Sequence, residues 1–129
     1  RDHACQMLPR RGGGSHAGMH SGADARVFAH SACVDKCLRV LIGIEDPATP
    51  DPVAGAAAIG RVIEGRGIHL PIVQHGLGPS AWPVLSDAVA RRYDLRIGLE
   101  DTLVMPDGVP AKNNAALVAA AVALVSAHA

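Results

Sequence analysis

The sequence has few aromatic residues, since Phe28, Trp82 and Tyr93 are the only three in 129 positions. Proteins that bind single-stranded nucleic acid stack the bases on aromatic side chains, and three scattered rings cannot build such a platform. The chain also lacks a charge excess, because 12 basic side chains balance 12 acidic ones and the isoelectric point is near 7.2. Nucleic acids and anionic membranes attract clustered Lys and Arg. We therefore expect neither as a partner.

Cysteines and long apolar runs are scarce as well. The three cysteines are Cys5, Cys33 and Cys37. An odd number does not suit a small secreted module held together by disulfides, and it favours a reducing, cytoplasmic compartment. The longest apolar run, residues 115–127, covers 13 positions, whereas a helix that spans a bilayer needs about 20. We expect no transmembrane segment.

Short apolar runs alternate with helical patterns after a first segment, residues 1–20, that is rich in Gly and His and expected to be irregular. Strands are predicted at residues 38–44, 71–75 and 95–99. Helices are predicted to begin after Ser21, Asp51, Ser80 and Asn113 or Asn114, each of which can cap a helix. The last helix has apolar residues on one face, namely Leu117, Val118, Ala121, Leu124 and Val125.

The alternation of strand and helix predicts parallel βαβ units, about four in number, and hence an α/β fold. Such units occur in open doubly wound sheets and in (β/α)8 barrels. No G-x-G-x-x-G motif follows a predicted strand, which argues against a dinucleotide-binding sheet. A complete barrel needs about 250 residues, so this chain corresponds to about half of one. Because it begins with Arg1 rather than Met, we expect it to be a fragment of a longer protein.

The densest group of reactive side chains lies at the end of the third predicted strand. On a strand, Arg96, Gly98 and Glu100 would share one face, and Asp101 could join them where the strand ends. Ligands of α/β proteins bind at this carboxyl edge of the sheet. The alternative is a solvated strand end with no ligand. Glu45 and Asp46, which follow residues 38–44, could face the site, but we expect them to form a solvated loop before Pro47.

Three segments carry a resemblance to a known family: residues 96–108 (RIGLEDTLVMPDG), 75–85 (HGLGPSAWPVL) and 113–118 (NNAALV). They resemble the β-keto acid cleavage enzymes, which include the 3-keto-5-aminohexanoate cleavage enzyme of lysine fermentation. Residues 16–29 and 35–42 are similar more weakly, and the resemblance covers roughly residues 16–125. It implies that residues 16–129 are the C-terminal part of a (β/α)8 TIM barrel, preceded by an irregular segment, residues 1–15.

The resemblance also implies a zinc-dependent enzyme that condenses a β-keto acid with acetyl-CoA and cleaves the adduct to acetoacetate and a new acyl-CoA. Glu100 matches the glutamate that binds the metal, and Arg96 and Asp101 match the pair that abstracts a proton from the substrate. Zinc accepts carboxylate ligands and polarises carbonyl oxygens, and a cation beside Asp101 favours its ionised form. The family's other two ligands form a His-x-His motif, which this chain lacks.

Further candidates are weaker. His75 could line the site or replace a lost ligand, or it could be a hydrogen-bonded structural residue. Gly76, Gly78 and Ser80 lead into a helix whose N-terminus could receive a phosphate of CoA, although an ordinary tight loop would look the same. The pair His16 and His20 superficially suggests zinc but lies in Gly-rich sequence without a clear helix. The cluster of His30, Cys33 and Cys37 mixes spacings that no common tetrahedral zinc site uses.

Two alternatives to the enzyme remain. One is a non-catalytic half-barrel remnant or assembly module that has lost the metal site, and the other is a small open-sheet ligand-binding domain. If the chain is half of a barrel, whether catalytic or not, its uncovered strand edges favour pairing with another chain. We therefore expect a homo-oligomer or a complementing half-barrel as the partner.

Overall fold

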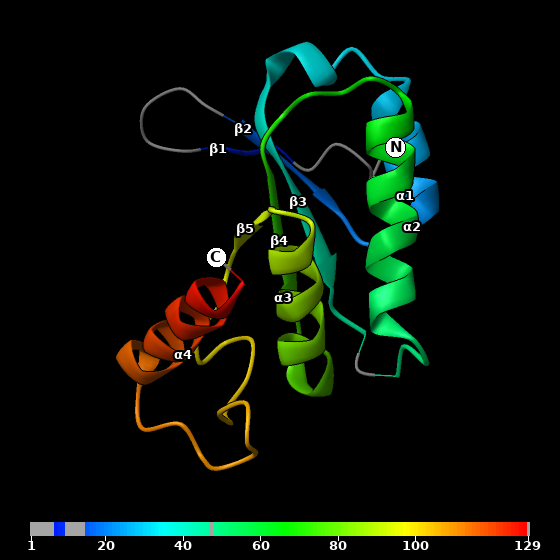
Figure 1. Cartoon of the computed structure of the whole chain (residues 1–129). Helices are drawn as coiled ribbons and strands as arrows, with labels where there is room; N and C mark the ends of the chain where they lie inside the picture. Colours follow the sequence, from blue (N-terminus) through cyan, green and yellow to red (C-terminus); the bar gives the residue numbers. More distant parts are fainter. Residues whose placement is uncertain (1–6, 10–14, 47, 129) are drawn as a thin grey trace.

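Five strands form one sheet in which neighbours in space are also neighbours in the sequence. The computed structural model describes residues 7–9, 15–46 and 48–128, with side chains from residue 17 onward. Strands β2 to β5 are parallel, and β1 pairs with β2 in the antiparallel direction. The order along the chain (Figure 1) is β1 (Met7–Pro9), β2 (Ser15–Met19), α1 (Gly22–Ala29), β3 (Cys37–Ile44), α2 (Pro52–Gly65), β4 (Ile72–Gly76), α3 (Ala81–Ala90), β5 (Asp94–Leu95) and α4 (Asn114–Ala127).

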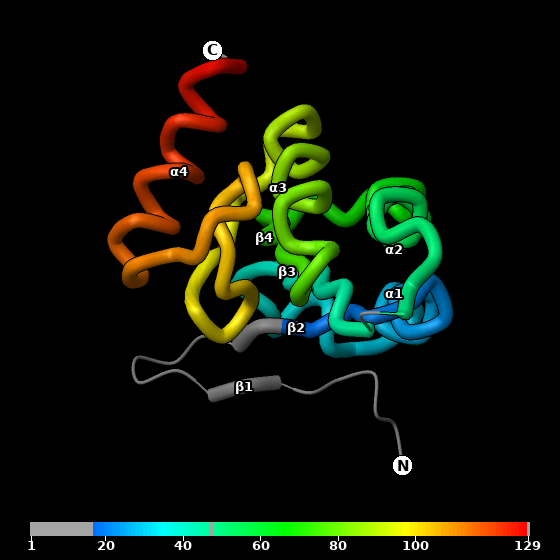
Figure 2. The backbone as a smooth tube through the Cα atoms, turned by 90° about the horizontal axis from the view of Figure 1, so that it is seen from below, coloured from blue at the N-terminus to red at the C-terminus, as the bar shows by residue number. Residues whose placement is uncertain are grey.

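The helices lie together on one side of the sheet. Each helix contacts the next one along the chain, from α1 to α4, and α1, α2 and α3 also contact β2, β3 and β4 in turn. Figure 2 shows the helices as an arc around the parallel strands. A doubly wound sheet has helices on both faces and a reversal of strand order. Consecutive parallel strands with helices on one face are instead compatible with part of a barrel wall, as the sequence predicts.

Three helices begin where the sequence predicts, because a side chain caps each N-terminus. The Ser21 hydroxyl accepts a hydrogen bond from the Asp24 amide at 3.1 Å, and the Asp51 carboxylate accepts one from the Ala54 amide at 3.0 Å. Asn113 caps α4 in the same way. These caps satisfy backbone donors that the first turn leaves open. Ser80 precedes α3 as predicted, but its side chain makes no capping bond.

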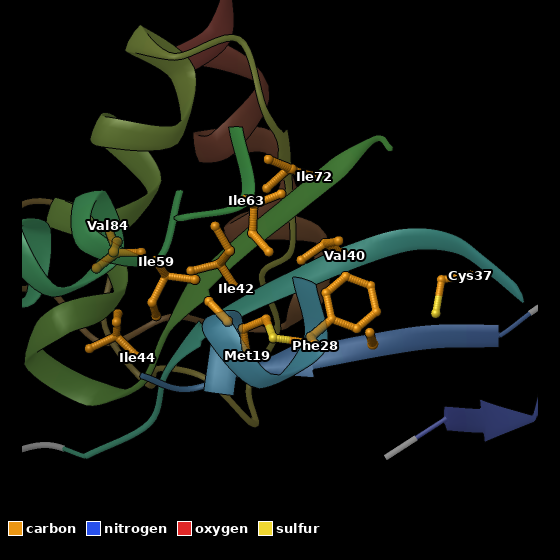
Figure 3. Close-up of a cluster of buried hydrophobic side chains, with 13 residues drawn as sticks. Met19, Phe28, Cys37, Val40, Ile42, Ile44, Ile59, Ile63, Ile72 and Val84 are labelled. Atoms are coloured by element: carbon orange, nitrogen blue, oxygen red, sulfur yellow. The ribbon is translucent and has the colours of Figure 1, made fainter. Parts of the chain in front are cut away.

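The hydrophobic core lies between the sheet and the helices. Alternate residues of β3, namely Val40, Ile42 and Ile44, point into it and are almost completely buried (Figure 3). They pack with residues from the neighbouring strands and from the helices, including Met19, Phe28, Ile59, Ile63, Ile72 and Val84. The intervening positions of β3 and β4 face the opposite side of the sheet, where Gly43 lies beside His75.

One strand lies in the segment expected to be irregular. Residues 15–19 form β2, which pairs in parallel with β3 along its length. Ala17 and Met19 are completely buried in the core. This burial stabilises a strand that could not be predicted from the Gly- and His-rich sequence. Residues 7–9 form β1, while residues 1–6 and 10–14 of the predicted irregular segment fall outside the described residues.

The third predicted strand is shorter than expected. Residues 95–99 were predicted to be extended, but β5 ends at Leu95. The Leu99 amide donates a hydrogen bond to the Asn114 side chain at 2.8 Å, and the Asp101 amide donates to the Gly98 carbonyl at 2.9 Å. These two bonds satisfy backbone donors outside the sheet, so the chain turns at this point.

Helix α4 buries less than its apolar sequence suggests. Of the predicted face, Leu117 and Ala121 are buried, whereas Val118 and Val125 are 48% and 49% exposed. Val122 is also exposed, at 58%. Within the described ranges, none of the helices has the length and apolarity needed to cross a membrane.

Candidate functional site

Polar side chains from three parallel strands and their loops meet at the carboxyl edge of the sheet. Gly43 of β3 lies opposite His75 of β4 in the parallel register, and Glu45 follows β3 directly. The turn after β5 adds Asp101, and Arg96 lies just beyond the end of β5. This is the edge at which α/β proteins bind their ligands.

His75 and Asp101 form a buried pair at the centre of this site. Their Nδ1 and Oδ1 atoms are 3.2 Å apart, and the two side chains are only 2% and 1% exposed. The Arg96 Nη2 atom lies 3.6 Å from the same Oδ1. The second carboxylate oxygen, Oδ2, is buried and has no hydrogen-bond partner among the described residues. One oxygen of Asp101 is therefore held by two cationic or polar neighbours, while the other is left to accept a proton or a hydrogen bond.

A turn, and not strand alternation, brings the predicted catalytic residues together. Arg96 forms an ion pair with Glu100 and reaches Asp101 with the same nitrogen. The sequence-based expectation of a shared strand face for Arg96, Gly98 and Glu100 is wrong, because β5 has ended before these positions. The grouping survives because the turn that begins at Gly98 returns Asp101 toward β4.

The surroundings of His75 favour its neutral form. Burial lowers the pKa of His75 below its usual value of 6.5, and the Arg96 guanidinium lowers it further. Asp101 and Glu45 act in the opposite direction without reversing the shift. Carboxylates only accept, and Asp101 Oδ1 lies within hydrogen-bonding distance of Nδ1 at 3.2 Å, whereas the nearest carboxylate oxygen to Nε2 lies at 3.9 Å. We therefore assign the single imidazole proton to Nδ1, which donates to Asp101. The other nitrogen, Nε2, is then an acceptor.

Sequence reasoning missed how Glu45 and His20 relate to this pair. The Glu45 Oε1 atom lies 3.9 Å from His75 Nε2, and its Oε2 atom lies 3.7 Å from His20 Nδ1. Glu45 was expected to be solvated, and its side chain is 51% exposed. The position of Glu45 directly after a parallel strand could have predicted its place in the site, because the same position at a strand end identified Asp101 as a candidate. His20 could not be found in this way because β2 was not predicted.

The loop after β4 is built around close backbone contacts. A Cβ atom on Gly76 would lie 2.6 Å from the Ser80 carbonyl oxygen, so only glycine fits there. Gly78 has a φ of +57°, and its amide donates to the Asp101 carbonyl at 2.6 Å. Ser80 is buried. This geometry ties the loop to Asp101, and the CoA contact expected of Gly76, Gly78 and Ser80 stays a prediction.

The described residues supply at most one ligand of the zinc site that the resemblance implies. Glu100 has the right chemistry, because carboxylate oxygens bind zinc, and its side chain is 70% exposed beside the site. No group of three His, Cys, Asp or Glu side chains in the described part of the chain is arranged to hold a metal ion. We therefore derive no catalytic step through a metal.

The fold and site define an α/β protein with consecutive parallel strands and a polar cluster at their carboxyl edge. A family model described as beta-keto acid cleavage enzyme matches residues 16–128. The chain therefore belongs to the β-keto acid cleavage enzyme family, which confirms the resemblance carried by residues 96–108 and 75–85. None of the curated proteins matches the chain.

Proposed function

We propose that this chain carries the proton-abstracting half of a β-keto acid cleavage site. The reaction joins a β-keto acid to the acetyl group of acetyl-CoA and cleaves the adduct to acetoacetate and a new acyl-CoA. The observation that carries the proposal is the Asp101 carboxylate, which has one oxygen beside His75 and Arg96 and a second, buried oxygen without a described partner. Family membership supplies the reaction class.

In this proposal Asp101 is the base. The carbon between the keto and carboxylate groups of a β-keto acid loses a proton so that it can attack the thioester carbon of acetyl-CoA, and a positioned carboxylate accelerates such transfers. Arg96 sits beside both Asp101 and Glu100. Its fixed positive charge balances the two carboxylates and the carbanion that develops near them.

Glu100 is proposed as a zinc ligand, with the remaining ligands supplied from outside the described residues. Bound zinc would polarise the keto oxygen of the substrate. The carboxylate of Glu100 already lies next to Arg96, so metal binding would compete with this ion pair. A cytoplasmic location and a CoA contact through Gly78 and Ser80 stay predictions.

A second chain is proposed to cover the exposed side of the half-barrel. Val118, Val122 and Val125 are about half exposed and recur at the spacing of one helical face on α4. A surface of this kind favours association. The partner is either another copy of the chain or a complementing half-barrel, and the barrel closure that follows from it is part of the proposal.

The test is a product assay with this chain and, in parallel, with the longest reading frame that contains it. Each protein is mixed with zinc, acetyl-CoA and a panel of β-keto acids, and acetoacetate and the new acyl-CoA are quantified by mass spectrometry. Asp101→Asn serves as the inactive control. The proposal expects both products in equal amounts from at least one substrate. Absence of products from both proteins would favour the non-catalytic half-barrel instead.

A further inference from the structure

A glycine at position 43 makes room for two imidazole rings on the inner face of the sheet, which is the face opposite the helices. A Cβ atom at Gly43 would lie 2.7 Å from His75 Nε2 and 3.2 Å from His20 Nδ1. The first distance is closer than real side-chain contacts allow, so any other residue would displace the His75 ring. Gly18, on the neighbouring strand β2, is different, because its Cβ would make an ordinary contact of 3.6 Å with His20 Nε2.

One nitrogen of the His75 ring has a hydrogen-bond partner among the described residues and the other has none. Nδ1 faces Asp101 Oδ1 at 3.2 Å, while Nε2 is buried and has no hydrogen-bond partner among the described residues. The ring and the Asp101 side chain are buried together, at 2% and 1% exposure, so the contact that fixes the ring is the one with the proposed base.

We propose that His75 is a positioning residue that donates from Nδ1 to Asp101 Oδ1 and so turns Oδ2 toward the substrate, with Gly43 providing the space for the ring. This inference rests on the proposed function, because it assigns the orientation of the proposed base. His75 takes no part in metal or CoA binding in this arrangement. The Asp101 main chain is held separately, through the Gly98 carbonyl and the Gly78 amide, so that His75 controls the side chain alone.

Charged groups lie on both sides of the ring. Glu45, which also pairs with His20, has its Oε1 atom 3.9 Å from Nε2 and favours a proton on that nitrogen. Asp101 Oδ1 is closer to Nδ1, at 3.2 Å, and favours the proton there. Arg96 already provides a positive charge near the Asp101 carboxylate, and burial opposes a second one on the imidazole. A neutral donor orients the carboxylate without adding a buried charge.

The first test needs no activity. Long-range ¹H–¹⁵N spectra of the zinc-stripped chain report which nitrogen of His75 carries the proton, and the exposed ring of His69 provides an internal reference. We expect the Nδ1–H form in the wild type and its loss in Asp101→Asn and Gly43→Ala. Gly18→Ala is the matched control and keeps the wild-type spectrum. A wild-type spectrum with the proton on Nε2 would overturn the proposal.

The second test uses three replacements of His75 in the product assay. An Asn amide lies as many bonds from Cβ as Nδ1 does, so His75→Asn can still donate to Asp101, whereas His75→Gln places its amide nearer to the position of Nε2. We expect His75→Asn to keep kcat within about tenfold, and His75→Gln and His75→Leu to lose about 100-fold in kcat with little change in KM, because misplacement of a catalytic group by about 1 Å costs that much.

The outcomes separate the two proposals. Better activity in His75→Gln than in His75→Asn would show that Nε2 acts on a ligand and would overturn the positioning role. A wild-type protein without activity contradicts the proposed function, and the tautomer spectra then still decide the role of His75. Circular dichroism of each variant identifies any that fail to fold.

Discussion

The backbone amide of Gly78 donates a hydrogen bond to the carbonyl of Asp101 at 2.6 Å, so the loop after β4 holds the turn after β5. The two loops thereby act as one unit at the carboxyl edge of the sheet. Gly76 makes this possible, because its missing Cβ lets the Ser80 backbone approach. The position of the proposed base therefore depends on a loop for which the sequence left open a CoA contact or an ordinary tight turn.

Replacement of Asp101 should abolish turnover without unfolding the protein. Asp101→Asn keeps the size of the side chain but removes the base, and we expect a loss of about 10²- to 10⁴-fold in kcat, which is the range that positioned bases contribute. Acetoacetate formation measures the loss. The exposed Asp107, whose Oδ1 accepts a hydrogen bond from the Val109 amide, gives the matched control Asp107→Asn. Equal activity in both variants would remove Asp101 from the mechanism.

Replacement of Glu100 should weaken zinc binding. A Gln side chain lacks the negative charge of the proposed ligand, and changes around metal sites commonly cost about 10- to 100-fold in affinity. Competition with a chelating dye measures the change, with the protein encoded by the longest reading frame that contains the chain, since that protein would supply the remaining ligands. Glu64→Gln is the control, because Glu64 is exposed and contacts Tyr93 away from the site. Unchanged affinity in Glu100→Gln would show that Glu100 is not a ligand.

Stability should fall as the solution becomes more acidic than pH 6.5. The pKa of His75 is lowered in the folded protein from 6.5, mainly by burial, so the unfolded chain binds the proton first. The stabilising contribution is complete above 6.5 and is lost as the pH falls toward the folded pKa. Urea midpoints on both sides of pH 6.5 measure the slope. His75→Asn should make this part of the profile flatter, and an unchanged slope would contradict the assignment.

Two glycines should respond in opposite ways to alanine. Gly76→Ala places a Cβ 2.6 Å from the Ser80 carbonyl oxygen, and such overpacking costs about 1–3 kcal/mol or more in unfolding free energy. Gly65 ends α2 and has no atom within 4 Å of the added Cβ, so Gly65→Ala should be neutral or stabilise by up to about 1 kcal/mol. Chemical denaturation compares the two. Equal effects would show that the Gly76 contact does not constrain the loop.

A charge on the exposed face of α4 should reduce self-association. Val122 is 58% exposed between Val118 and Val125, so Val122→Glu would place a carboxylate in the proposed interface and lower the weight-average mass in sedimentation experiments. Val27, 48% exposed on α1, provides the control Val27→Glu. A wild-type protein that is monomeric at all concentrations would contradict the interface itself.

Helix starts could be predicted because their signals are local. Ser21, Asp51 and Asn113 each cap an amide three residues further along the chain, and such bonds depend only on nearby residues. The strand at residues 15–19 could not, because its stability comes from pairing with β3 and from the burial of Ala17 and Met19. Likewise, the early end of β5 could not be predicted, because the turn that follows it includes a bond from the Leu99 amide to Asn114, which lies 15 residues away.

The sequence by itself determined the alternation of strand and helix, the helix caps and the family, together with the candidates Arg96, Glu100 and Asp101. Only the tertiary structure decided that His75 holds Asp101, that His20 and Glu45 lie beside His75, and that Gly43 leaves room for the rings. Caps and helical periodicity arise from interactions a few residues apart. The site arises from the register of parallel strands and from two loops that bond to each other, and this register forms only when distant segments share one hydrophobic core.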